Sequence, residues 1–227
     1  MRFLYVYPTH IQREIVMSVN AMFWDRVAKR YAAQPVSDPA AYEVTLSRTA
    51  SYLSADQTIL ELGCGTGSTA VTLAPSVAQM LATDFSAKMI EFGQERARAA
   101  GLSNLKFQVC DLETAPVGPF DAVLAFNLFH LLPELDASLQ KVSQRLKPGG
   151  LFISKTVCMQ DAKSGLKRRL IGAVLPMMRW VGKAPDTVHF MTVRDWQRRI
   201  EMAGFEILET GSYPADLPSR FVVARKS

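Results

Sequence analysis

The sequence predicts an α/β protein built around a mostly parallel sheet. Short apolar segments alternate with longer segments whose apolar residues recur at helical spacing. Residues 58–62 form the first apolar segment and lead directly into closely spaced glycines, and residues 120–126 are nearly all apolar. Such a continuous apolar run is typical of a central parallel strand, which helices cover on both faces. Strands that alternate with helices in this way form βαβ units.

The first strand and the turn after it are the most informative part of the chain. Residues 58–67 read Thr-Ile-Leu-Glu-Leu-Gly-Cys-Gly-Thr-Gly. Glycines at 63, 65 and 67 remove β-carbons from a sharp turn into a helix, so a ligand can lie against bare backbone. Glu61 lies near the end of the strand, where a carboxylate is costly unless a cation or a hydrogen-bond donor meets it. The pattern therefore predicts a site for a nucleoside that carries an amine.

The remaining elements follow in a regular order. We expect helices at 41–53, 87–100, 139–146 and 192–203, and strands at 79–83, 105–110, 120–126, 151–157, 205–208 and 221–224. Ser86 is a suitable N-cap for the helix that begins at Ala87, and Gly101 is a suitable end. Asp84 directly follows the second strand. An acid about twenty residues beyond a glycine turn suits the two hydroxyls of a ribose.

The glycine turn resembles motif I of the class I S-adenosylmethionine-dependent methyltransferases, whose pattern is E-x-G-x-G-x-G. A dinucleotide-binding turn, G-x-G-x-x-G, would need a glycine where this chain has Ser68. The resemblance extends over roughly residues 22–227 and includes the Lys-Pro-Gly-Gly turn at 147–150. It implies a Rossmann-like, doubly wound, seven-stranded sheet with helices on both faces and an antiparallel C-terminal strand. It also implies S-adenosylmethionine as the cofactor and S-adenosylhomocysteine as the product.

The resemblance assigns roles to individual residues. The implied cofactor-binding residues are Glu61, Gly63, Cys64, Gly65, Thr66, Gly67, Asp84, Phe85, Met89, Asp111, Leu112 and Asn127. Residues 61–67 would hold the methionine part, and Asp84 the ribose. Phe85 and Met89 would pack near the adenine. Asp111 and Leu112 would meet the edge of the adenine, with Asp111 accepting a hydrogen bond from its amine. Asn127 would line the methyl-transfer site at the end of the fourth strand.

Four side chains are candidates for a catalytic role. Asn127 would lie at the transfer site, and Tyr31 could orient substrate or cofactor. His130 follows the fourth strand and is a candidate general base, as is His189, because imidazole titrates near neutrality. A base is needed only if the acceptor must lose a proton, and either histidine could equally be an ordinary structural residue. The histidines and acids show no metal-binding spacing, so we expect no metal.

We expect one domain over residues 1–227, with less typical segments at its beginning and before its last helix. Residues 1–21 lack a clear period and are expected to form an extension. Residues 22–53 form a helical segment in which Phe23, Val27 and Tyr31 share one face. Similar segments in small-molecule methyltransferases fold over the cofactor, although this one could also be a simple packing helix.

Residues 160–190 form a basic insertion. No acid occurs from 162 to 185, while apolar residues there recur at helical spacing. The insertion could be a lid over the substrate, a plain packing helix, a peripheral membrane contact through 163–183, or a nucleic-acid contact.

Net charge and sequence motifs restrict the class of methyl acceptor. The net charge of +5 would suit RNA, but no RNA-binding module is visible, and the Asn-Leu-Phe-His segment at 127–130 differs from the Asn-Pro-Pro-Tyr of nucleic-acid enzymes. We favour a small, partly apolar acceptor that is lipid-, quinone- or natural-product-like. The alternatives are an RNA methyltransferase, a nicotinamide-dependent oxidoreductase, and a cofactor-binding protein without turnover. Three cysteines, no secretory signal and no long apolar stretch predict a cytoplasmic protein. The oligomeric state stays open.

Overall fold

The computed structural model describes residues 10–158, 187–213 and 219–227. Its centre is a seven-stranded sheet in the order β3-β2-β1-β4-β5-β7-β6. The strands are β1 (Thr58–Leu62), β2 (Gln79–Asp84), β3 (Leu105–Val109), β4 (Phe120–Phe126), β5 (Leu146–Val157), β6 (Phe205–Gly211) and β7 (Ser219–Lys226). The first five run parallel, and β7 pairs antiparallel with both β5 and β6. The predicted fold class is therefore confirmed.

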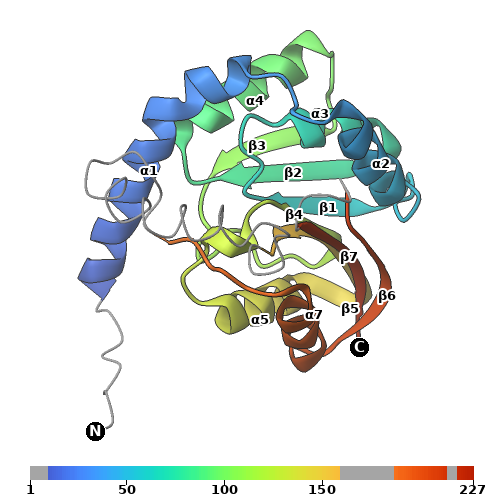
Figure 1. Cartoon of the computed structure of the whole chain (residues 1–227). Helices are drawn as coiled ribbons and strands as arrows, with labels where there is room; N and C mark the ends of the chain where they lie inside the picture. The colour runs from blue at the N-terminus through green and yellow to red at the C-terminus, as the bar shows by residue number, and fades with distance from the viewer. Residues whose placement is uncertain (1–9, 159–186, 214–218) are drawn as a thin grey trace, which may run out of the picture.

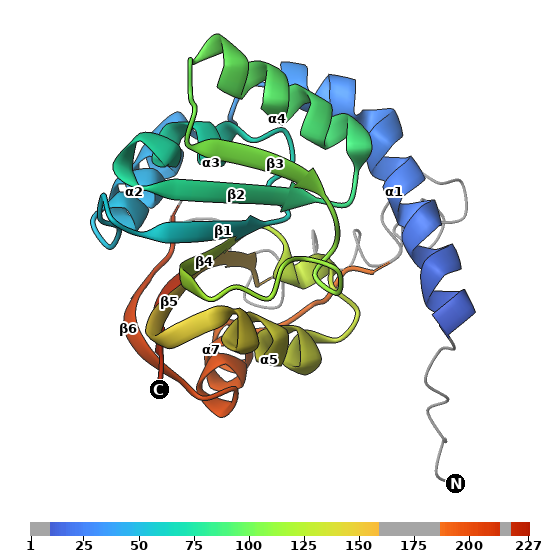
Figure 2. The ribbon, with the colours of Figure 1, turned by 180° about the vertical axis from the view of Figure 1, so that it is seen from behind.

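Helices cover both faces of this sheet (Figures 1 and 2). They are α1 (His10–Ala33), α2 (Pro39–Ala50), α3 (Ser68–Leu73), α4 (Ala87–Ala99), α5 (Leu135–Arg145) and α7 (Val193–Met202), with short 3₁₀ turns at Ala74–Ser76 and Phe129–Leu131. One core packs α5 and α7 against the sheet, and the other packs α2, α3 and α4. Successive residues of β4 enter these two cores alternately, which explains its continuous apolar sequence.

Three of the described helices begin at side chains that cap their free N–H groups. Asp38 accepts from the N–H of Ala41 at 2.9 Å at the start of α2. Ser86 accepts from Met89 at 3.1 Å at the start of α4, as predicted, and Thr192 does the same for Asp195 at 3.0 Å in α7. These caps fix the residue at which each of these helices begins.

Three differences from the expected elements bear on the organisation of the chain. Helix α1 begins at His10, so the expected boundary between an extension and a helical segment at residue 22 is not a structural boundary. Strand β5 begins at Leu146 and includes the Lys-Pro-Gly-Gly segment, which was expected to be only a turn. Residues 187–190, the described end of the basic insertion, are not helical. The expected lid and the membrane contact at 163–183 lie outside the described residues.

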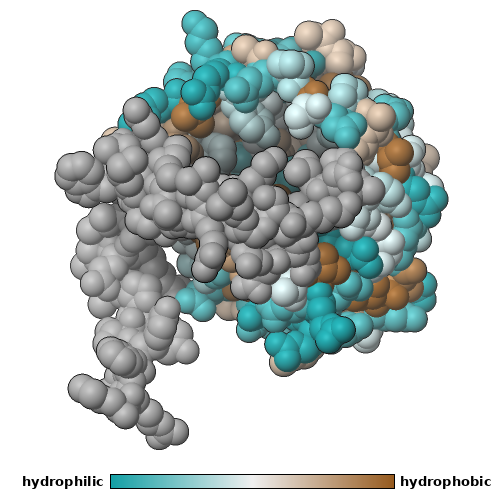
Figure 3. Space-filling view, in the orientation of Figure 1, coloured by the Kyte–Doolittle hydropathy of each residue, from teal (hydrophilic) through white to brown (hydrophobic). Residues whose placement is uncertain are grey.

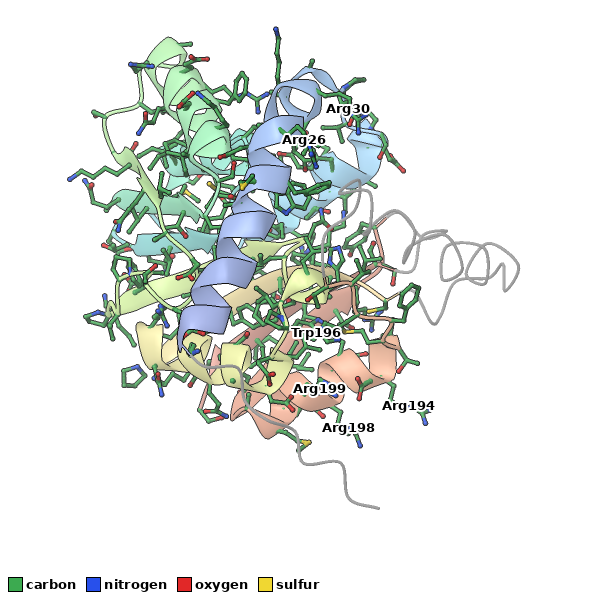
Figure 4. All side chains as sticks on the ribbon, turned by 90° about the vertical axis from the view of Figure 1, so that its left-hand side faces the viewer. Arg26, Arg30, Arg194, Trp196, Arg198 and Arg199 are labelled. Atoms are coloured by element: carbon green, nitrogen blue, oxygen red, sulfur yellow. The ribbon has the colours of Figure 1, made fainter. Side chains whose placement is uncertain are left out.

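Helix α1 runs past the edge at which the parallel strands end (Figures 1 and 2). Seen from that side, it crosses in front of the sheet (Figure 4). Two of its described side chains reach the residues that follow β1 and β2: Tyr31 lies beside Gly65, and Asp25 accepts from the hydroxyl of Ser86. In parallel α/β sheets this is the edge where ligands bind.

The described surface is mixed in polarity. On the face shown in Figure 3, hydrophobic residues form small patches between hydrophilic ones. Among the described residues, no helix combines the length and the apolar composition that are needed to cross a bilayer.

Candidate functional site

The turn that joins β1 to α3 has a backbone conformation that favours glycine. Gly63, Gly65 and Gly67 have φ angles of 65°, 53° and 74°. A Cβ added at Gly65 would have one described neighbour within 4 Å, Tyr31, at 3.8 Å. A Cβ at Gly67 would instead come within 2.7 Å of the Phe107 ring. Gly67 thus permits close packing, whereas Gly65 leaves bare backbone against which a ligand can lie.

Asp84 holds the turn from the neighbouring strand end. Its carboxylate is buried and accepts from the N–H of Gly65 at 2.9 Å and from the N–H of Ser86 at 2.9 Å. Burial raises the pKa of Asp84, and these two N–H groups oppose the rise. A carboxylate has about four acceptor sites, so Asp84 keeps capacity for further donors. It therefore shapes the turn and can still bind a ligand.

Glu61 is the least satisfied group of the site. Its side chain is 2% exposed, and its Oε2 has no hydrogen-bond partner. Burial and the nearby Asp84 raise the pKa of Glu61 to about 8. Such a carboxyl is stabilised when a cationic or hydrogen-bonding ligand meets it. S-adenosylmethionine carries an ammonium and a sulfonium, so this orphaned acid beside an open glycine backbone fits the cofactor that the sequence implied.

Arg96 on α4 connects the glycine turn to two helices, a role that the sequence did not reveal. Its guanidinium donates to the carbonyl and the hydroxyl of Thr66 at 3.1 and 2.9 Å, and to the hydroxyl of Ser68. It also donates to the carbonyl of Ala32 at 3.1 Å, at the end of α1. One side chain thus fixes the turn relative to α1.

Helix α1 is also joined to the start of α4. Asp25 accepts from the hydroxyl of Ser86 at 2.6 Å and from the N–H of Lys88 at 3.1 Å. Tyr31, further along α1, is half-exposed and lies next to Gly65. Burial of its hydroxyl and the Asp84 carboxylate raise the pKa of Tyr31. The structure therefore places Tyr31 beside the glycine turn.

The loop after β3 carries two more of the predicted residues. Asp111 accepts from the N–H and the hydroxyl of Thr114 at 2.7 and 2.6 Å. Leu112 is buried, and its carbonyl accepts from the buried Arg145 at 2.7 Å. Arg145 donates to Ala115 as well, at 2.8 Å. This arginine, which the sequence did not single out, fixes the loop that was predicted to meet the adenine.

The other predicted cofactor residues lie around the same strand ends. Cys64, Thr66 and Met89 are buried, and Phe85 is partly buried. The N–H of Cys64 donates to the carbonyl of Thr83 at 2.9 Å, which joins the glycine turn to β2. Burial raises the pKa of the Cys64 thiol well above its usual range, so this thiol stays protonated.

The acceptor side of the site centres on the end of β4. Asn127 is exposed and has a φ of 55°. His130 is partly buried, its Nδ1 has no hydrogen-bond partner, and burial together with His189 lowers its pKa to about 4. His189 contacts it through a backbone bond of 2.7 Å to the His130 carbonyl, and its Nε2 donates to the carbonyl of Leu132 at 2.7 Å. His130 is therefore neutral near pH 7 and only weakly basic.

Within residues 10–158, 187–213 and 219–227, no cluster of histidine, cysteine and acidic side chains could hold a metal ion. An open surface hollow of about 840 Å³ lies beside α7, and all its described lining residues belong to that helix or its cap. Figure 4 shows Arg194 and Arg198 of this hollow pointing outward, whereas Trp196 points into the molecule. The hollow contains none of the predicted site residues.

Known proteins resemble this chain in sequence. A family model described as a methyltransferase domain matches residues 53–199. The chain is 30% identical over 166 residues to the highly reducing polyketide synthase sthA of Phaeosphaeria nodorum, a match that covers 69% of this chain and 6% of the synthase. It is 30% identical over 145 residues to a fatty-acid O-methyltransferase of Mycolicibacterium smegmatis, which covers 63% of this chain and 51% of that protein.

Solved structures share the fold. The structure of DhpI in complex with S-adenosylhomocysteine (SAH) superposes with a TM-score of 0.71 at 19% identity, over 93% of this chain and 97% of DhpI.

Proposed function

Because the chain belongs to the class I S-adenosylmethionine-dependent methyltransferases, we propose that it methylates a small organic acceptor with an apolar portion. The observation that carries the cofactor half of this proposal is the orphaned carboxyl of Glu61 beside the open backbone of Gly65. The similarity to a fatty-acid O-methyltransferase and to polyketide synthases supports the acceptor half.

Each residue of the site has a role in this proposal. Glu61 would meet the positive charge of the methionine part, and Gly65 would let the ligand approach the backbone. Asp84 would accept from the ribose hydroxyls with the acceptor sites that its backbone bonds leave free. Asp111, held by Thr114, would accept from the adenine amine. Arg96 would act through the turn, as a positioning residue.

The bound cofactor supplies a methyl group on a sulfonium, and the sulfur keeps the electron pair of the broken bond. The main task of this chain is then to align the acceptor and to exclude water. Helix α1 crosses the edge of the sheet where this would happen (Figure 4). Asn127 would line the acceptor side, and Tyr31 would contact the ligand near Gly65. His130 is neutral at pH 7 and could accept a proton, but its low pKa makes it a weak base.

Calorimetric titration with SAH tests the cofactor assignment, with NADH as the competing ligand. We expect SAH to bind and NADH not to bind. Asp84→Asn should weaken SAH binding, whereas Asp56→Asn, a change at an exposed carboxylate in the loop before β1, should not. Binding of NADH in place of SAH would show that the chain is an oxidoreductase.

Turnover needs a separate assay. Release of labelled methyl groups to a panel of small acids, alcohols, amines and RNA would distinguish the acceptor classes. Methylation of RNA alone would contradict the proposed acceptor, and SAH binding without any transfer would favour a protein that binds the cofactor but does not turn it over.

A further inference from the structure

Lys155 lies where the carboxyl ends of β4 and β5 meet. In the parallel pairing of these strands it is the partner of Phe126, the last residue of β4. Its carbonyl accepts from the N–H of Asn127 at 2.7 Å. The backbone of Lys155 is therefore fixed directly beside the residue that is expected to line the methyl-transfer site.

The ammonium of Lys155 is half-buried and has few partners. Its Nζ donates to the hydroxyl oxygen of Thr45 on α2 at 3.2 Å, while that hydroxyl donates onward to the carbonyl of Ala41 at 2.8 Å. Among the described residues, no carboxylate lies within ion-pair distance of Nζ. Asp38, the cap of α2, attracts the ammonium only from farther away. Two of its three N–H groups thus remain without a described partner.

The Nζ of Lys155 has fewer described acceptors than other buried or partly buried cations of this protein. The Nζ of Lys226 donates to two backbone carbonyls, and the guanidinium of the buried Arg145 donates to three. Moving an ammonium out of water without a partner is unfavourable, and burial accordingly lowers the pKa of Lys155. Charged groups held in this way at the edge of a ligand site are candidates for ligand recognition.

We propose that Lys155 binds the methyl acceptor, and that this acceptor is a carboxylate on an apolar chain. The inference rests on the proposed function of the same site and names its substrate class. Two free N–H groups suit the two oxygens of a carboxylate. The adjacent Phe126 and the cross-strand Phe221 are apolar neighbours of the lysine stem.

A carboxylate acceptor also removes the need for a strong base. One carboxylate oxygen supplies the electron pair of the new bond to the methyl carbon, and the sulfur keeps the pair of the broken bond. The anion and the sulfonium become a neutral ester and a neutral thioether, and no proton is released. The weak basicity of His130 is then no obstacle to the reaction.

The first experiment measures acceptor binding by calorimetry on the full chain saturated with SAH. The probes are dodecanoate, dodecanol, dodecylamine and the 1,3-diketone tridecane-2,4-dione, which share an apolar chain and differ in the head group. We expect dodecanoate to bind at least about tenfold more tightly than each of the others, the size of effect that one charge-assisted contact produces. Equal or tighter binding of any other probe, or no binding of dodecanoate, would overturn the inference.

The second experiment changes the lysine. Lys155→Met keeps an unbranched apolar stem, one atom shorter, and removes the charge, whereas Lys155→Arg keeps the charge. Lys147→Met is the matched control, because Lys147 lies on the same strand at its opposite end. We expect Lys155→Met to weaken dodecanoate binding about tenfold or more and to leave dodecanol and SAH binding unchanged. Lys155→Arg should retain most of the affinity, and Lys147→Met all of it.

The outcomes separate the two proposals. If Lys155 only covered apolar surface, Lys155→Met would prefer dodecanoate over dodecanol as strongly as the wild type does. That result would refute the role of Lys155 in binding the carboxylate. Normal SAH binding without dodecanoate binding would contradict this inference alone. Absence of SAH binding in the wild type would contradict the proposed function itself. Mass spectrometry should find methyl dodecanoate as the product, formed more slowly by Lys155→Met.

Discussion

Replacing Glu61 by glutamine should stabilise the ligand-free protein at high pH and weaken its binding of SAH. The pKa of this buried carboxyl is about 8 in the folded protein, against 4.5 for the ordinary group. Between these values the folded state keeps a proton that the unfolded state has lost, so stability falls as the pH rises. The fall begins near pH 4.5 and is complete above pH 8. The whole shift corresponds to about 5 kcal/mol.

Glutamine fits the same space and does not ionise, so Glu61→Gln should lack this dependence. We expect its free energy of unfolding, relative to the wild type, to rise by about 4 kcal/mol between pH 5 and pH 9. Groups that titrate in both proteins, such as His130, cancel in this difference. Urea unfolding at pH 5, 7 and 9 measures it. Parallel pH profiles for the two proteins would refute the reasoning.

The same variant tests the ligand role. Loss of a charge-assisted contact should weaken SAH binding by about 1.5 to 3 kcal/mol. If the stability of Glu61→Gln relative to the wild type rose with pH as expected but SAH bound normally, Glu61 would be a buried acid that the ligand does not touch.

Three further changes test other parts of the site. Asp84→Asn should weaken SAH binding by about 1 to 3 kcal/mol in calorimetry, and unchanged affinity would mean that the ribose lies elsewhere. Gly65→Val should abolish SAH binding in a protein that still folds. Gly67→Ala should instead lower the midpoint of thermal unfolding, because its Cβ would press on Phe107. The opposite pattern would mean that Gly67 admits the ligand and Gly65 serves packing. The pKa of His130 is lowered from 6.5 to about 4, so the wild type should lose up to about 3 kcal/mol of stability as the pH falls through this range. In acid titrations followed by circular dichroism, His130→Gln should therefore unfold at a lower pH than the wild type. Coincident unfolding curves would show that protonation of His130 does not destabilise the protein.

The local features of the fold were predictable because each depends on a short stretch of sequence. The continuous apolar run of β4 indicated a strand buried on both faces, and the structure has it between two cores. Ser86 was predicted to cap α4 and does so. The start of α1 was not predictable, because the residues before 22 show no clear apolar period. In the structure, residues 10–21 belong to the same helix as residues 22–33.

The long-range contacts of the site were not visible in the sequence. In the sequence, Arg96 follows Glu95 and precedes an alanine-arginine pair, and it resembles an ordinary surface residue. It reaches the glycine turn and the end of α1 only because the fold packs α4 against both. Lys155 likewise reads as the polar residue of a strand, and its missing counter-charge appears only once α2 is in place.

By itself, the sequence determined the order of strands and helices, the glycine turn and the acids at the strand ends, because these follow from local conformation and apolar periodicity. Only the tertiary structure decided how those groups ionise and what they touch. The raised pKa of Glu61 and the lowered pKa of His130 arise from burial by residues distant in the chain. Desolvation is a property of the packed molecule, and a linear pattern does not contain it.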